Sequence, residues 1–174
     1  MKIIVLASQK GGVGKTTLAA HIAVAAEQSG DGPCVLIDTD PQASLAAWWN
    51  GREAQTPAFA PVGLKELPGK LEALGQAGYA YAFIDTPPAI TESIRAVVAQ
   101  ADFVLIPTRP SPHDLRAVGS TVELAVTAER DRVLMGLAVP QASGPGAPLS
   151  QAAPLASADQ SAAEKPLPEN SGSG

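Results

Sequence analysis

Residues 2–17 read KIIVLASQKGGVGKTT, and this stretch decides the fold class. Its first part, Lys2 to Ala7, contains an uninterrupted apolar run, which is typical of a short strand buried on both faces. A glycine-rich loop follows, and apolar residues at helical spacing then extend from Thr16 to Glu27. The stretch therefore predicts a strand, a tight loop and a helix, with the loop at the carboxyl end of the strand.

The glycine-rich loop departs from the phosphate-binding pattern G-x-x-x-x-G-K-[ST] only at Gln9, which replaces the first glycine. Glycines adopt the positive φ angles that turn successive backbone N–H groups inward, and the start of a helix adds the positive end of its dipole. The loop therefore predicts an anion site made by the backbone of Gly11, Gly12, Val13 and Gly14. The alternative is a glycine-rich turn that holds no ligand.

Two side chains at the end of the loop complete this predicted phosphate site. The Lys15 ammonium would reach the β- and γ-phosphates of a nucleotide, and the Thr16 hydroxyl would bind Mg²⁺. An extra lysine, Lys10, stands at the entrance of the loop, where the pattern requires no particular residue. Taken alone, Lys10 is more simply a solvated loop lysine.

Acidic residues follow two further apolar strands. Asp85 follows the predicted strand Tyr81–Ile84, and Asp38 and Asp40 follow the predicted strand Cys34–Ile37. Because Mg²⁺ keeps several waters, it needs only one or two carboxylates from the protein. We expect Asp85 and Asp38 to hold the magnesium shell and Asp40 to orient an attacking water. The alternative is that these residues begin loops and accept hydrogen bonds from backbone amides.

The remaining sequence alternates between predicted strands and helices, which indicates an α/β fold with a mostly parallel sheet and helices on both faces. Residues 52–63 are predicted to form a loop, and residues 64–76, which contain Pro68, a kinked helix or two short ones. The other predicted elements are helices over 42–49, 93–101 and 114–130, a strand over 103–107 and a further strand over 132–139.

Composition divides the chain into two predicted parts. Residues 1–139 carry the motifs, whereas residues 140–174 are mostly Ala, Pro, Ser, Gly and Gln and are predicted to be a disordered tail. The net charge of -5 argues against a protein that coats nucleic acid. No apolar run reaches the roughly 18 residues of a membrane helix, and a single cysteine fits a reducing compartment. We therefore expect a cytoplasmic protein.

Three motifs together resemble a known family: KGGVGKTT, DTDPQ at 38–42 and DTPP at 85–88. In order and spacing, over residues 1–125, they resemble the deviant Walker A ATPases of the ParA/MinD superfamily, most closely the ParA-type partition ATPases. The resemblance implies a P-loop NTPase-like fold, ATP and Mg²⁺ as ligands, and an ATP-dependent homodimer. It also implies that Lys10 reaches the nucleotide of the second subunit and that Thr17 lies near the α-phosphate.

The resemblance further implies a slow ATPase in plasmid or chromosome partitioning, with a centromere-binding protein and non-specific DNA as partners and no membrane anchor. After Ala125 the match fades, so the chain is expected to be truncated or divergent relative to the family. We assign no catalytic role to Arg109, His113 or Asp114, and we predict a capping or surface role for His113. Two alternatives stay open: a nucleotide-binding regulatory module that does not hydrolyse ATP, and a phosphotransferase acting on a small molecule.

Overall fold

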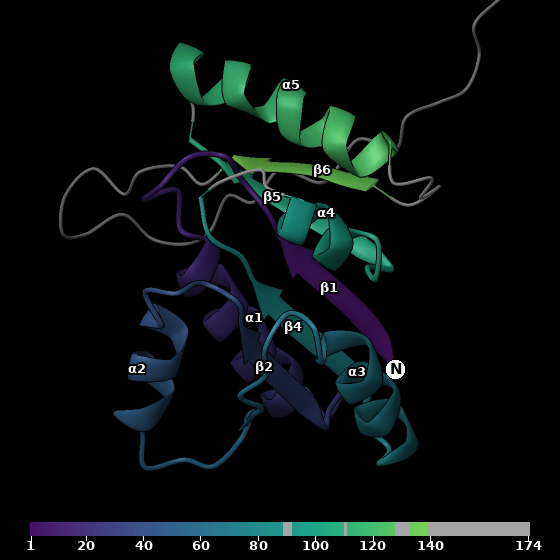
Figure 1. Cartoon of the computed structure of the whole chain (residues 1–174). Helices are drawn as coiled ribbons and strands as arrows, with labels where there is room; N and C mark the ends of the chain where they lie inside the picture. Colours follow the sequence, from purple (N-terminus) through teal and green to yellow (C-terminus); the bar gives the residue numbers. More distant parts are fainter. Residues whose placement is uncertain (89–91, 110, 128–132, 139–174) are drawn as a thin grey trace, which may run out of the picture. The chain divides into compact units, whose positions relative to one another are not determined.

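The computed structural model describes residues 1–88, 92–109, 111–127 and 133–138, which lie in one compact unit, Met1–Gln141. Within these residues six strands form one sheet in the order β3-β2-β4-β1-β5-β6, and neighbouring strands all pair in parallel (Figure 1). The strands are β1 (Lys2–Leu6), β2 (Cys34–Asp38), β3 (Ala58–Phe59), β4 (Tyr81–Asp85), β5 (Phe103–Thr108) and β6 (Val133–Ala138).

Helices cover both faces of this sheet, and the described ones are α1 (Lys15–Gln28), α2 (Ser44–Asn50), α3 (Leu67–Gln76), α4 (Glu92–Val98) and α5 (Pro112–Thr127). Alternate residues of a strand point to opposite faces. In β2, Val35 and Ile37 therefore pack on the side of α3, α4 and α5, whereas Cys34 and Leu36 pack on the side of α1 and α2. The predicted α/β fold, with a parallel sheet and helices on both faces, is confirmed.

Two predictions between residues 52 and 76 are wrong. The predicted loop over 52–63 contains β3, whose Ala58 pairs with Val35 of β2. Because β3 is only two residues long, it has no alternating pattern, and only its pairing with the sheet reveals it. The predicted kinked or divided helix is the single helix α3, which has Pro68 in its first turn. The missing N–H of proline breaks no helical hydrogen bond there, so Pro68 is accommodated in the first turn without kinking the helix.

The predicted strand over 132–139 is confirmed as β6, which pairs with β5 at the edge of the described sheet. Residues 128–130 of the predicted last helix lie outside the described residues, and so does the predicted tail from residue 140. Among the residues that the structure describes, no helix combines the length and the apolar character that crossing a membrane requires.

The carboxyl ends of three neighbouring strands bring the predicted motifs together. Leu6 of β1 pairs with Asp85 of β4, and Asp38 of β2 pairs with the same Asp85. The fully buried Thr86 donates a hydrogen bond to the Leu6 carbonyl over 2.7 Å and so connects the ends of β1 and β4. The glycine loop, Asp85 and Asp38 therefore lie at one edge of the sheet, where open α/β sheets bind their ligands.

Candidate functional site

The glycine loop between β1 and α1 contains two glycines that its shape requires. Gly12 and Gly14 have φ angles of 70° and 93°, in the left-handed region that other residues rarely adopt. A Cβ atom at either position would meet no heavy atom within 4 Å beyond its chain neighbours. Gly14 precedes the first turn of α1 without a capping side chain, and this turn has no acidic residue. The N–H groups at this helix start are therefore suited to bind an anion.

Lys15 belongs to the first turn of α1, and its side chain reaches back into the glycine loop. The residue is 7% exposed, and its Nζ donates a hydrogen bond to the Lys10 carbonyl over 3.3 Å. Burial lowers the pKa of Lys15, and the carboxylates of Asp85 and Asp40 oppose this shift. The loop therefore encloses a desolvated cation, which an anionic phosphate would stabilise. The other predicted loop residues are an exposed Gly11, a buried Val13 and an exposed Thr17.

Asp85, at the end of β4, is fully buried, and its two carboxylate oxygens differ. Oδ2 accepts a hydrogen bond from Thr16 Oγ1 over 2.5 Å, whereas Oδ1 is buried with no hydrogen-bond partner. The pKa of Asp85 is raised to about 6, mainly by burial and further by Asp38 and Asp40, although the Thr16 hydroxyl and Lys15 oppose the shift. A buried acceptor without a partner costs about 1–3 kcal/mol. Asp85 is therefore placed to gain from a bound cation.

The surroundings of Asp85 fit Mg²⁺ in particular. In the part of the chain that the structure describes, no group of three or more His, Cys, Asp and Glu side chains could enclose a metal by itself. Mg²⁺ needs no such cage, because it keeps waters and takes one or two protein oxygens together with substrate phosphates. The Thr16 hydroxyl and Oδ1 of Asp85 offer such oxygens next to the glycine loop.

The acidic loop after β2 is held together by its own aspartates. The Asp38 carboxylate accepts hydrogen bonds from the amides of Asp40 and Ala46, each over 3.0 Å. Asp40 Oδ1 accepts one from the Gln42 amide over 2.9 Å. Ala43 follows with a φ angle of 50°, in the left-handed region, just before α2. This geometry corresponds to the alternative in which the aspartates bind backbone amides, and the metal role of Asp38 and the water-orienting role of Asp40 stay predictions.

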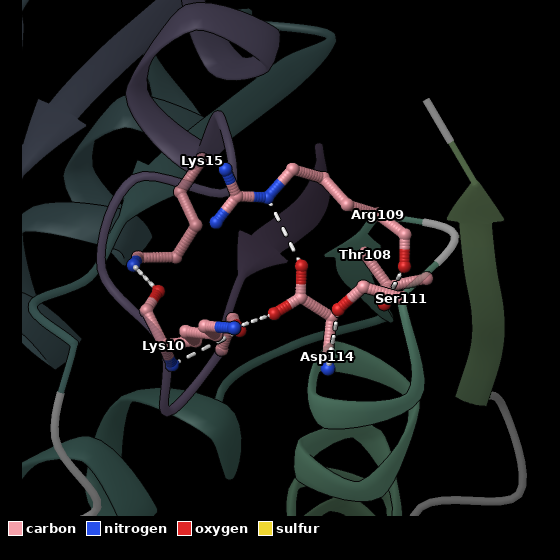
Figure 2. A network of polar contacts seen from close by, with 7 residues as sticks. Lys10, Lys15, Thr108, Arg109, Ser111 and Asp114 are labelled. Carbon is pink, nitrogen blue, oxygen red and sulfur yellow. Dashed lines mark hydrogen bonds and ion pairs between the residues drawn. The ribbon is translucent and has the colours of Figure 1, made fainter. Parts of the chain in front are cut away.

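Lys10 has a partner that the sequence does not predict. Its ammonium forms an ion pair with Oδ1 of Asp114, in the first turn of α5, and Oδ2 of Asp114 accepts a hydrogen bond from Arg109 Nε over 3.0 Å (Figure 2). Asp114 is only 3% exposed. Asp114 and Arg109 have no catalytic role predicted from the sequence, and their contact with the glycine loop is not predicted either, because 104 residues separate Lys10 from Asp114.

A local signal for this contact exists near the start of α5. Ser111 and Asp114 have the spacing of a helix-start motif, in which a serine and an acidic residue three positions later stabilise the first turn. The Asp114 amide donates a hydrogen bond to Ser111 Oγ over 3.2 Å. The motif fixes the aspartate at the helix start, but it does not reveal which cation binds there. His113 is exposed in the same turn, in agreement with the predicted surface role.

Comparisons with known proteins agree with this geometry. The family model described as the CobQ/CobB/MinD/ParA nucleotide binding domain matches residues 4–143, and so extends past the point at which the motif resemblance fades. Among curated relatives, a maintenance of carboxysome distribution protein A from Gloeobacter kilaueensis is 36% identical over 147 residues. This alignment covers 82% of the chain but only 66% of the relative, so the chain spans less than two thirds of that relative's length.

Solved structures of related proteins have the same fold. A plasmid partition protein from Borrelia burgdorferi superposes with a TM-score of 0.66 at 20% identity, over 79% of this chain and 78% of that one. A variant of McdA from Cyanothece in complex with ATP superposes with a TM-score of 0.60 at 24% identity, over 79% of this chain and 70% of that one. Because the family model matches most of its length, the chain belongs to the CobQ/CobB/MinD/ParA family of nucleotide-binding domains.

Proposed function

We propose that this chain is a magnesium-dependent switch protein that binds and hydrolyses ATP. The observation that carries the proposal is the fully buried Asp85, which has one oxygen on Thr16 and the other without a partner. Together with the buried Lys15 and the glycine loop, it favours a ligand that combines a metal cation with phosphate groups. The presence of ATP in the Cyanothece McdA structure supports ATP as that ligand.

The proposed roles follow from the position of each residue. The backbone from Gly11 to Gly14 binds the phosphates, Lys15 neutralises charge on the β- and γ-phosphates, and Thr17 lies near the α-phosphate. Thr16 and Asp85 would hold Mg²⁺, and Asp38 would contribute only to its outer shell, because both Asp38 oxygens already accept backbone amides. When bound, Mg²⁺ would neutralise the charge that develops on the transferred phosphate. Asp40 orients the water that attacks the γ-phosphate.

Lys10 has its proposed role in a second subunit. In an ATP-dependent homodimer, Lys10 of each subunit contacts the nucleotide of the other, in the manner of an arginine finger. Hydrolysis removes this contact, so the nucleotide controls whether the subunits stay together. The family and the Borrelia plasmid partition protein support a role in plasmid or chromosome partitioning. The proposed partners are a centromere-binding protein and non-specific DNA, in the cytoplasm.

Calorimetric titration with MgATP, together with ATP turnover in the presence and absence of DNA, tests this proposal. We expect Lys15→Ala to weaken MgATP binding about a hundredfold, because it removes the cation inside the loop. Lys10→Ala should keep MgATP binding and lose turnover. Lys70→Ala, which removes an exposed lysine of α3, is the matched control and should behave like the wild type. Folded wild-type protein that shows neither binding heat nor a thermal shift with MgATP would contradict the proposal.

A regulatory module that binds ATP without hydrolysing it is the second candidate. Two contacts favour it, because Lys10 is paired within its own chain and one Asp40 oxygen already accepts the Gln42 amide. Wild-type binding heat without turnover, whether or not DNA is present, would select this candidate.

A further inference from the structure

A buried carboxylate at the start of α5 binds two cations from different parts of the chain. Oδ1 of Asp114 pairs with the Lys10 ammonium, and Oδ2 pairs with Arg109 (Figure 2). The Asp114 side chain is 2% exposed, whereas the side chains of Lys10 and Arg109 are 37% and 35% exposed. The anion is therefore enclosed by the protein, while both cations reach solvent.

Local hydrogen bonds fix Asp114 in this position. Its amide donates to Ser111 Oγ over 3.2 Å, and the Ser111 amide donates to the Arg109 carbonyl over 2.7 Å. The Leu115 amide donates to the Ser111 carbonyl over 3.0 Å. Asp114 also lies in the first turn of α5, where the helix dipole stabilises a carboxylate. None of these interactions involves Lys10, so the backbone of Asp114 keeps its place if Lys10 leaves, and the bond from Arg109 Nε still orients the carboxylate.

Arg109 lowers the free-energy cost of separating Lys10 from Asp114. Removing one partner of a buried ion pair is strongly destabilising when the remaining charge is left uncompensated. When the Lys10 side chain leaves, Asp114 stays paired with Arg109, so the charge of Asp114 remains compensated. Loss of Arg109 would instead leave Lys10 as the cation that compensates Asp114, and Lys10 would then be harder to remove.

Lys10 also contacts the phosphate loop through its main chain. Its carbonyl accepts the hydrogen bond from Lys15 Nζ over 3.3 Å (Figure 2). Its amide donates to Ser8 Oγ over 3.3 Å. A single residue therefore contacts α5 with its side chain and the buried lysine of the loop with its carbonyl. A change in the Lys10 side chain is thus placed to affect the loop directly.

We propose that Asp114 is a positioning residue that holds Lys10 within its own chain when no nucleotide is bound, and that Arg109 makes this hold reversible. The hold follows from the geometry of the single chain. The contact of the released Lys10 with the nucleotide of a second subunit rests on the proposed ATP-dependent dimer. Two variants should therefore act in opposite directions: Asp114→Asn frees Lys10, and Arg109→Ala holds it more firmly.

The hold is tested first without nucleotide, by NMR of the lysine ammonium groups in the full chain. Lys10→Arg assigns the Lys10 signal. In the wild type, the Lys10 ammonium should exchange its hydrogens slowly with water. Asp114→Asn should accelerate this exchange about tenfold, the scale of a hydrogen bond between charged groups. Arg109→Ala should slow it, and Glu92→Gln, which breaks the exposed ion pair with Arg95, should leave it unchanged.

Sedimentation of the same variants with MgATP tests the release. Asp114→Asn should dimerise at several-fold lower protein concentration than the wild type, and Arg109→Ala at several-fold higher concentration.

Equal exchange of the Lys10 ammonium hydrogens in the wild type and Asp114→Asn would show that Asp114 does not hold Lys10. Equal exchange in the wild type and Arg109→Ala would overturn the role of Arg109, and this comparison remains decisive if Asp114→Asn does not fold. A confirmed hold in a protein that neither binds ATP nor dimerises would instead refute the proposed function alone.

Discussion

Asp38 and Asp85 are paired residues on neighbouring parallel strands, yet their carboxylates have opposite environments. Asp38 is half-buried, and its two oxygens accept the amides of Asp40 and Ala46. Asp85 is fully buried, and one of its oxygens has no partner. Because both residues end a strand at the same edge of the sheet, strand position does not explain the difference. It arises from the segment after β2, which turns back so that the amides of Asp40 and Ala46 reach the Asp38 carboxylate.

Asp38 therefore stabilises its own loop, whereas the buried charge of Asp85 is unfavourable as long as no ligand is bound. The hydrogen bonds of Asp38 are complete within the chain, so Asp38 contributes to folding. Asp85 is desolvated and incompletely paired, which is the usual condition of residues that bind a metal or take part in chemistry. Among the aspartates predicted from the sequence, we therefore expect Asp85 to matter most for binding and Asp38 most for the fold.

The largest expected effect is on MgATP affinity. Asp85→Asn should weaken MgATP binding about a hundredfold, because it removes the buried charge that would hold the cation. Asp38→Asn, the matched change on the neighbouring strand, should weaken it no more than about threefold. Calorimetry with MgATP, and with ATP and a chelator, measures both. An equal loss in the two variants would show that both aspartates hold the metal, as predicted from the sequence.

The next effect is on stability without nucleotide, where the two variants should have opposite signs. At neutral pH, Asp85→Asn should raise the free energy of unfolding by about 1–2 kcal/mol, because it removes an unfavourable buried charge. Asp38→Asn should lower it by about 1–2 kcal/mol, because the new amide group cannot accept the hydrogen bond that one carboxylate oxygen accepts. Urea unfolding measures both values. A loss of stability in Asp85→Asn would mean that its carboxylate is better paired than the structure indicates.

The pH dependence of stability gives a second measurement of the Asp85 carboxyl group. The pKa of Asp85 rises from 3.8 to about 6 on folding, so the folded chain binds this proton more tightly than the unfolded chain does. The stability that the proton contributes is complete below about pH 4 and is lost as the pH rises through about 6. The advantage of Asp85→Asn over the wild type should therefore be small at acidic pH and full above neutrality. An advantage that does not change with pH would contradict this assignment.

The sequence predicts most of the fold and of the phosphate loop because their signals are local. A run of apolar residues identifies each buried strand, and the spacing of the glycines, Lys15 and Thr16 defines the loop. The environments of Asp38 and Asp85 are not local, since they depend on which amides the folded chain brings near each carboxylate. The contact between Lys10 and Asp114 spans 104 residues, and no periodic pattern indicates it.

Two threonines that bind different atoms of Asp85 allow a finer comparison. Thr16 Oγ1 donates to the side chain of Asp85, and Thr39 Oγ1 donates to its backbone carbonyl over 2.6 Å. Thr16→Val should weaken MgATP binding about tenfold, since it removes a predicted metal ligand. It should also raise the pKa of Asp85 further, because the Thr16 hydroxyl opposes the effect of burial. Thr39→Val should cost about 1 kcal/mol of stability without a change in affinity. Equal losses of affinity would contradict the separation of the two roles.

The smallest expected effect concerns Ala43, which adopts a left-handed conformation in the acidic loop with a φ angle of 50°. Because that conformation is strained for alanine, Ala43→Gly should raise the free energy of unfolding by about 0.5–1 kcal/mol in urea. Ala47→Gly, at an exposed position within α2, is the control and should lower it by about 1 kcal/mol.

The MgATP affinity of the Ala43→Gly variant then shows whether the strained conformation of Ala43 contributes to nucleotide binding. If the acidic loop mainly serves the fold, relaxing Ala43 should leave the affinity unchanged, and the strain is a local cost without a role in binding. If relaxing it weakens MgATP binding, the conformation of the loop is itself part of the site, and the amide hydrogen bonds of Asp38 and Asp40 must rearrange when the nucleotide binds. The contrast between Asp38 and Asp85 would then describe only the nucleotide-free chain, because both strand ends would form the site together.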